Sequence, residues 1–288
     1  MLKIVEKTKI MFAISLFIIV IGMGFLATRG LNLGIDFTGG AVLNVSMNQE
    51  FKKADVDKII DKYAKNQYLS KTVDDGKDYE VTIKSDALTA DEIATMVKEI
   101  KTQFKSSELA SQDTTGASVG SELKSKAVLA LIIAVICMLV YIGFRFEFKF
   151  ATAAIIALLH DVLITLGVYA VFQIPVNATF IAAILTIIGY SINDTIVIFD
   201  RIRENQKKMR KASIDQITNE SITETMPRSI NTVATTLFTI VAVYVFVPSI
   251  RDLSLPLIIG ILVGCYSSIF IASPVWVILK KRNKKATT

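Results

Sequence analysis

The chain has 288 residues, 52% of them hydrophobic, and carries a formal net charge of +6. Its apolar residues are concentrated in long blocks and do not recur at the spacing of a soluble core, which excludes an ordinary soluble domain. With one histidine, two cysteines and no nucleotide-binding motif, the chain disfavours hydrolase chemistry, and we expect no cofactor and no metal.

Six apolar blocks are each long enough to cross a membrane, because a bilayer core about 30 Å thick needs roughly 20 mostly apolar helical residues. The predicted spans are residues 10–28, 127–144, 150–172, 179–199, 228–247 and 255–279. The first block is longer than the apolar region of a signal peptide and no clear A-x-A site follows it, so we expect an uncleaved anchor. Cys137 and Cys265 both fall inside spans and are expected to be reduced packing residues.

The Lys and Arg residues of the short loops predict the orientation of the spans. Both terminal tails and the loop at 200–227 are rich in basic residues, whereas the loops at 173–178 and 248–254 hold only Arg251. We therefore expect both termini in the cytoplasm and residues 29–126 outside it. The basic charge indicates membrane topology and contact with lipid, not nucleic-acid binding.

Residues 29–126, between the first two spans, have the composition of a soluble surface. Apolar residues that alternate with polar ones predict a strand at 41–47, and apolar residues at helical spacing predict a helix at 54–65. Two short predicted strands, 68–73 and 79–84, flank the turn signal Asp74-Asp75-Gly76. Thr89 and Glu92 form a capping box for a second helix, and a polar, strand-compatible stretch follows to about residue 119. The order β-α-β-β-α-β is that of a ferredoxin-like plait.

The expected fold class is a polytopic α-helical membrane protein with six transmembrane helices and a small α+β, ferredoxin-like extracytoplasmic domain. The parts are residues 1–28, the cytoplasmic tail and first span; 29–126, the external domain; 127–279, a five-helix transmembrane domain with the basic cytoplasmic loop 200–227; and 280–288, a basic cytoplasmic tail. In the loop, a capping box of Ser213 and Gln216 predicts an amphipathic helix at the membrane interface that ends at Pro227; a solvated loop is the alternative.

A few ionisable residues lie in or at the edge of the spans. At mid-membrane such a group costs at least ~2.5–3.5 kcal/mol, so we interpret these residues as functional. Asp161 and the single histidine, His160, lie midway along the third span, Asp194 lies in the fourth, and Arg228 opens the fifth. His160 fits a packing role and a relay role equally well.

Polar residues also form a stripe on one face of the fifth span, and a second stripe on the fourth. Because such stripes must face protein or water, we expect the two to meet, with Asp194 and Arg228 within reach of pairing. Hydrogen bonding between helices without ion transport is the alternative, above all for the threonines. The stripes are Arg228, Asn231, Thr232, Thr235, Thr236 and Thr239 in the fifth span, and Thr186, Gly189, Tyr190, Asn193 and Asp194 in the fourth.

Two sets of glycines have structural interpretations. Gly260 and Gly264, followed by Ser268, form a small-residue repeat that permits close helix packing, and we expect Gly189 of the fourth span to be a helix-packing residue as well. The segment Gly34-Ile-Asp-Phe-Thr-Gly-Gly40 follows the first span. Gly39 and Gly40 permit a tight turn, and Asp36 and Thr38 can hydrogen-bond local main chain, so we expect a joint between membrane and domain.

Three of these segments resemble the signatures of the SecF family: GIDFTGG at 34–40, GYSINDTIVIFDRIREN at 189–205 and RSINTVATT at 228–236. The resemblance covers the whole chain. It implies half of a resistance-nodulation-division transporter whose partner half is SecD. It also implies that Asp194 and Arg228 are essential for ion passage.

The resemblance further implies the role of this family, which is not enzymatic. With SecD, the proton-motive or sodium-motive force would pull preproteins from the SecY channel, late in their passage across the cytoplasmic (inner) membrane. Asp161, His160, Asn193, Asn231, Thr232 and Thr235 are the further candidates for the ion path. The rival interpretation is a passive scaffold that stabilises the SecY channel or assists membrane-protein insertion. Small-molecule efflux is a third, weakened by the small external domain.

Overall fold

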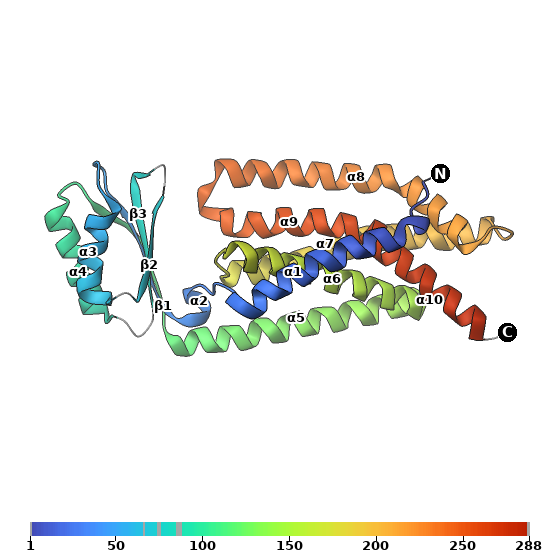
Figure 1. Ribbon diagram of the computed structural model, residues 1–288, viewed down its shortest axis with the longest axis horizontal. Helices are drawn as coiled ribbons and strands as arrows, with labels where there is room; N and C mark the ends of the chain where they lie inside the picture. The colour runs from blue at the N-terminus through green and yellow to red at the C-terminus, as the bar shows by residue number, and fades with distance from the viewer. Residues whose placement is uncertain (1, 66, 74–75, 85–87, 287–288) are drawn as a thin grey trace. The chain divides into compact units, whose positions relative to one another are not determined.

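The computed structural model describes residues 2–65, 67–73, 76–84 and 88–286 (Figure 1). They form two compact units, one made of Met1–Asn32 with Leu129–Thr288 and the other of Leu33–Val128. The first unit contains long apolar helices, and the second contains a small sheet with two covering helices.

Within the described chain, six helical stretches are long and apolar enough to cross a membrane, as the sequence predicts. They are α1 (Thr8–Arg29), α5 (Ala117–Arg145), α6 (Phe148–Phe172), α7 (Ala178–Lys208), α8 (Ile214–Phe246), and a sixth made of α9 (Arg251–Ser267), a π-helical turn (Ser268–Ala272) and α10 (Ser273–Ala286). A short 3-10 turn, η1 (Val5–Lys7), precedes α1. Helices α5, α7 and α8 run past the predicted spans, because polar helix-forming residues flank the apolar blocks.

The helices of the membrane unit differ in how much of their surface is covered. Helix α7 packs against α9, α8 and α6, and α1 lies along α6. Half of the most apolar window is buried in α6 and in the sixth span, but only 11% is buried in α1, α5 and α8. Helices α6, α7 and α9 therefore form the core, and α1, α5 and α8 present apolar surface to lipid or to a partner.

The predicted interfacial helix is wrong in one respect, because α8 does not end at Pro227 but continues to Phe246. Its capping box at Ser213 and Gln216 is present. The part of α8 before the proline packs against the N-terminal segment. The side-chain oxygen of the buried Asn219 accepts hydrogen bonds from the main-chain N–H groups of Ile4 and Val5, each at 3.0 Å. Pro227 removes one helical hydrogen bond, but these contacts hold the helix in place on the N-terminal side of the break.

The small unit is a ferredoxin-like plait, as predicted. Its antiparallel sheet has the order β2-β3-β1-β4, and α3 and α4 cover one face of it (Figure 1). The elements are β1 (Gly40–Ser46), α3 (Lys53–Ala64), β2 (Tyr68–Val73), β3 (Asp78–Lys84), α4 (Ala90–Gln103) and β4 (Glu108–Thr115). The capping box at Thr89 is present. Of the predicted turn, Asp74 and Asp75 lie outside the described residues, and Gly76 has φ +86°.

Asp57 on α3 joins that helix to the sheet. Its carboxylate accepts hydrogen bonds from Tyr79 at 2.5 Å and Ser70 at 2.7 Å, and Lys53 lies 2.7 Å away. Burial opposes ionisation, but these three donors outweigh it and hold the pKa of Asp57 below its usual range. Burial, helped by the hydrogen bond to the Asp57 carboxylate, raises the pKa of Tyr79.

The glycine segment contains a short helix, α2 (Ile35–Thr38), which a turn prediction did not anticipate. Gly39 has φ +74° and Gly40 has φ +131°, so both adopt conformations that L side chains rarely take. A Cβ on Gly40 would lie 2.2 Å from the carbonyl oxygen of Ile83 on β3. The Thr38 hydroxyl donates to the carbonyl oxygens of Gly34 and Gly39, at 3.1 and 3.0 Å. The segment therefore fixes how the chain enters β1.

Candidate functional site

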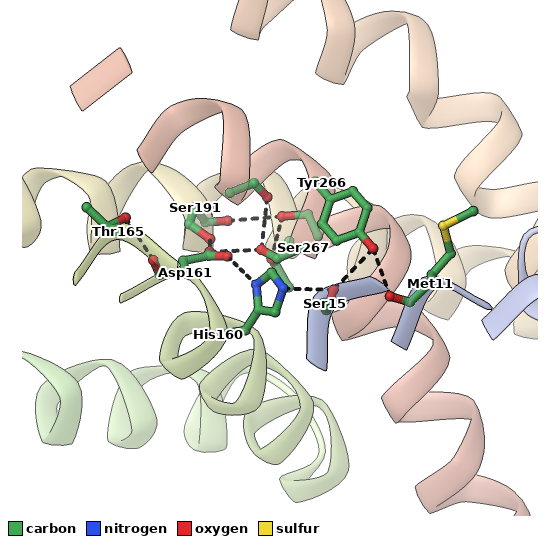
Figure 2. A network of polar contacts seen from close by, with 11 residues as sticks. Met11, Ser15, His160, Asp161, Thr165, Ser191, Tyr266 and Ser267 are labelled. Atoms are coloured by element: carbon green, nitrogen blue, oxygen red, sulfur yellow. Dashed lines mark hydrogen bonds and ion pairs between the residues drawn. The ribbon is translucent and has the colours of Figure 1, made fainter. Parts of the chain in front are cut away.

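Asp161 lies in the centre of the membrane unit and is fully buried. Figure 2 shows side chains from three helices around its carboxylate. Oδ2 accepts hydrogen bonds from Ser191 of α7 at 2.6 Å and from Ser267 of α9 at 2.8 Å. Oδ1 lies 3.0 Å from Nδ1 of His160, the preceding residue on α6. A buried carboxylate is tolerated here because every side of it meets a hydrogen-bonding group.

The His160 ring links this carboxylate to α1. Its Nε2 lies 3.0 Å from the hydroxyl of Ser15, which donates to Tyr266 at 3.1 Å (Figure 2). Tyr266 in turn donates to the main-chain oxygen of Met11 at 3.0 Å. The chain of polar contacts therefore runs from the bundle core to the first turns of α1.

His160 contacts a different helix through each of its ring nitrogens. Nδ1 faces the Asp161 carboxylate on its own helix α6, and Nε2 faces the Ser15 hydroxyl on α1, each at 3.0 Å. Which nitrogen donates depends on the tautomer of the ring. Both polar atoms of the buried imidazole therefore have a hydrogen-bonding partner.

Helices α7 and α8 meet along part of the two predicted polar stripes. Tyr190 donates to the main-chain oxygen of Thr232 at 3.0 Å, and its hydroxyl lies 2.9 Å from that of Thr236. One turn further along α7, Asp194 accepts a hydrogen bond from Ser229 at 2.5 Å. The structure therefore brings the stripes together at Tyr190, whereas Asp194 contacts a serine that lies outside the predicted stripe of α8.

The expected pairing of Asp194 with Arg228 is wrong for this conformation. No ion pair joins the two side chains among the described residues, and Ser229, the next residue along α8, takes the contact instead. Arg228 is exposed, whereas Ser229 is buried against α7. A helical step of about 100° separates adjacent residues, so both cannot face α7 at once.

The remaining stripe residues lie on the outer surface of the bundle. Asn193 on α7 and Asn231, Thr232 and Thr235 on α8 are exposed. The hydroxyls of Thr232 and Thr235 bond carbonyl oxygens of their own helix, at 2.8 and 2.9 Å. These residues are therefore not gathered around Asp161, and the side-chain amide of Asn231 lies on an otherwise self-satisfied, exposed face of α8.

The glycines of α9 lie at close contacts with α7. A Cβ on Gly260 would lie 2.2 Å from the Ile187 side chain, and one on Gly264 would lie 3.0 Å from Cβ of Ser191. Gly189 is different, since a Cβ there would meet nothing within 4 Å, and its interpretation as a packing residue is wrong.

The sequence did not single out several groups that the structure brings to the site. These are the hydroxyl groups of Ser15, Ser191, Tyr266 and Ser267. Serine inside an apolar span is the one signal that could have found three of them. Among the described residues no group of three or more His, Cys, Asp and Glu side chains could hold a metal ion.

A unit of six apolar helices with the buried Asp161 and the half-buried Asp194, joined in sequence to a ferredoxin-like unit, defines a polytopic membrane protein. Two family models match the sequence: the C-terminal region of the protein export membrane proteins SecD and SecF over residues 94–282, and the SecD/SecF GG motif over residues 24–50. The chain belongs to the SecF family of protein translocase subunits.

Relatives and solved structures agree with this assignment. The protein translocase subunit SecF of Sebaldella termitidis is 38% identical over 98% of this chain and 93% of its own length. That of Vibrio alginolyticus is 38% identical over 92% of this chain and 86% of its own. The crystal structure of SecDF from Thermus thermophilus, a translocon-associated membrane protein, superposes with a TM-score of 0.89 at 30% identity. The match covers 98% of this chain but only 39% of the SecDF chain.

Proposed function

We propose that this chain acts with SecD as an ion-driven subunit of the Sec export machinery, using the proton or sodium motive force in late steps of preprotein translocation. The relatives named above support the protein translocase part of this proposal. In that setting the chain makes and breaks no covalent bond, so it is a transport subunit and not an enzyme.

The observation that carries the proposal is the presence of two carboxylates, the buried Asp161 and the half-buried Asp194, among the helices of the membrane unit. Asp161 is fully buried beside a histidine, and Asp194 faces Ser229 across the contact of α7 with α8. Apolar residues would hold the same helices together at lower cost, since an ionisable group in mid-membrane is expensive. A carboxyl group that gains and loses an ion can change its hydrogen-bonding partner, so the helix bundle has one arrangement for each form of the group.

Arg228 provides the second state. In the conformation described here Asp194 contacts Ser229, and the exposed Arg228 guanidinium is the adjacent alternative on α8. We take the pairing of an ionised Asp194 with Arg228 as the other state, reached by a shift of α8 against α7. Each proton that crosses a potential of 100 mV delivers ~2.3 kcal/mol, which is enough to bias two states that differ by a few kcal/mol.

The exposed spans indicate where partners bind. The exposed face of α8 that carries Asn231, Thr232 and Thr235 includes a side-chain amide that lipid tails cannot hydrogen-bond, and we assign SecD to this face. The SecY channel and the translocating preprotein are further partners, and membrane lipid covers the apolar faces that remain. Nucleic acid is not among the expected partners.

The basic loops support the orientation, with both termini in the cytoplasm and the ferredoxin-like unit outside it. Residues 29–126 are then the extracytoplasmic domain. The Gly34–Gly40 segment, with Asp36, Gly39 and Gly40, is the joint that passes movement of the membrane helices to this domain.

The substitution Asp194→Asn tests the proposal, because it keeps the shape of the side chain and removes only the ionisable group. Membrane vesicles that contain SecD and either form of the chain are supplied with a model precursor at full membrane potential. We expect normal assembly and loss of the stimulation of export by the ion-motive force. An export rate equal to that of the unsubstituted protein would instead support the passive scaffold.

A further inference from the structure

The sixth span is interrupted by a π-helical turn at Ser268–Ala272, in the middle of the membrane unit. Pro274 explains the interruption, since it has no N–H group to offer the carbonyl four residues earlier and its ring crowds that carbonyl. The hydroxyl of Ser273 donates to the main-chain oxygen of Ser268 at 3.0 Å and stabilises the widened turn. Such turns are frequent at functional positions in helices.

The two consecutive serines at the start of this turn contact different parts of the site. Ser267 donates to Asp161 of α6 at 2.8 Å. Ser268 lies 2.8 Å from the hydroxyl of Thr195, the residue that follows Asp194 on α7. Both serines are fully buried, so the turn connects the surroundings of the two carboxylates without intervening solvent.

A second path of hydrogen bonds joins Ser268 to Asp161, by way of Ser191. Ser268 donates to the main-chain oxygen of Ser191 at 3.3 Å, and the hydroxyl of Ser191 donates to Asp161 at 2.6 Å. Ser191 is held near Ser268 by Gly264, where a Cβ would come within 3.0 Å of Cβ of Ser191. A movement of either carboxylate environment therefore displaces a side chain that the π-turn also holds.

We propose that the π-turn couples Asp161 to Asp194, with Ser268 and Thr195 as the positioning residues, so that loss or gain of an ion at one carboxylate changes the reactivity of the other. This inference rests on the proposed function. Neither residue carries the ion; they fix the distance and orientation between the two sites. The interruption of the sixth span is then a hinge between the two halves of the ion path.

The titratable and charged groups around the two carboxylates come from four helices. They are His160 on α6, Tyr190 on α7, Arg228 on α8, and Cys265 and Tyr266 on α9. Helix α1 contributes Ser15, which has no titratable side chain. The test therefore changes Asp161 alone among these groups and reads the effect at Asp194.

The experiment uses the full chain with SecD in lipid nanodiscs and measures how fast a hydrophobic carbodiimide labels Asp194, by mass spectrometry, across a range of pH. Carbodiimides modify carboxyl groups in their protonated form, so the labelling rate follows the state of Asp194. Substituting Asp161→Asn is expected to change the rate at fixed pH by about fivefold or more, the lower end of typical coupling between sites.

Breaking the contact between Ser268 and Thr195 should abolish that effect. In Ser268→Ala, and separately in Thr195→Val, adding Asp161→Asn is expected to leave Asp194 labelling unchanged. Ser268→Thr keeps the hydroxyl and should restore the effect. Ser254→Ala is the matched control, because Ser254 is a buried serine of α9 whose hydroxyl donates to the nearby main-chain oxygen of Ile250 and not to another helix.

Two results would overturn the proposal: labelling of Asp194 that does not respond to Asp161→Asn, or a response that survives both Ser268→Ala and Thr195→Val. The proposed function is tested apart from this, by export with Asp194→Asn. Loss of export stimulation there, with no coupling here, would refute the π-turn proposal and leave the transport role intact.

Discussion

Substituting Gly40→Ala should destabilise the pairing of β1 with β3 more than Gly76→Ala does. A residue with a side chain at a positive φ of this kind costs ~1–3 kcal/mol. The added Cβ would also lie 2.2 Å from the carbonyl oxygen of Ile83, so β1 and β3 must separate at this end. Overpacking of this sort costs ~1–3 kcal/mol, which gives a total of about 2–6 kcal/mol.

Hydrogen exchange of the full-length protein in nanodiscs, read by mass spectrometry, measures this loss. Since 1.36 kcal/mol is a factor of ten, a loss of about 2 kcal/mol raises exchange of the amides of β1 and β3 by roughly 30-fold. Gly76→Ala is the matched control, because Gly76 has φ +86° but a Cβ there would meet nothing within 4 Å in the described part of the chain beyond its own neighbours. Equal exchange in the two variants would refute the argument from the Ile83 contact.

Three further predictions concern other contacts. Asp57→Asn should make the free energy of unfolding less dependent on pH in the acid range. Because the folded protein lowers the pKa of Asp57, this carboxylate stabilises the fold above its unfolded-state pKa of about 4, and the stabilisation is lost as the pH falls through the lower folded-state pKa. Denaturant titrations at several pH values measure the difference between the two proteins. Arg228→Lys should reduce export stimulation, because lysine keeps the charge but loses the planar fork for a carboxylate, as vesicle export assays measure. Gly22→Ala should lower the melting temperature by a few degrees, because the added Cβ would lie 2.6 Å from Cα of Gly167.

Each of these predictions has its own contrary result. An acid-side stability loss that is unchanged in Asp57→Asn would show that another carboxylate causes it. Full export stimulation by Arg228→Lys would mean that a positive charge alone is sufficient at that position. Gly24→Ala is the control for Gly22→Ala, since a Cβ on Gly24 meets nothing within 4 Å, and equal melting temperatures would show that α1 and α6 separate freely.

The local patterns of the sequence predict the elements well, because hydropathy and capping act over short distances. Six apolar blocks became six spans, and the capping boxes at Thr89 and Ser213 start helices as expected. Pro227 misled the prediction because its local effect, one missing hydrogen bond, is outweighed by the contacts of Asn219 with the N-terminal segment. Propensity is a weak guide where tertiary contacts act on the same helix.

The site itself was only half predictable. Asp161, His160 and Asp194 stand out because ionisable groups are rare in apolar spans, and the facing of Tyr190 with Thr232 follows from helical spacing. Which partner each group takes depends on the rotation of one helix against another, which the spacing within a single helix does not contain. For that reason Ser229 and not Arg228 contacts Asp194, and the hydroxyls that surround Asp161 went unnoticed.

The central claim, that ions cross the membrane by way of Asp194 and Asp161, is tested most directly by flux. The chain and SecD are reconstituted into liposomes loaded with a pH-sensitive or a sodium-sensitive dye, and a membrane potential is imposed. We expect the unsubstituted protein to admit one of the two ions, and Asp194→Asn and Asp161→Asn each to reduce that flux to the level of empty liposomes. Equal flux through all three proteins would contradict the account and leave this chain a scaffold.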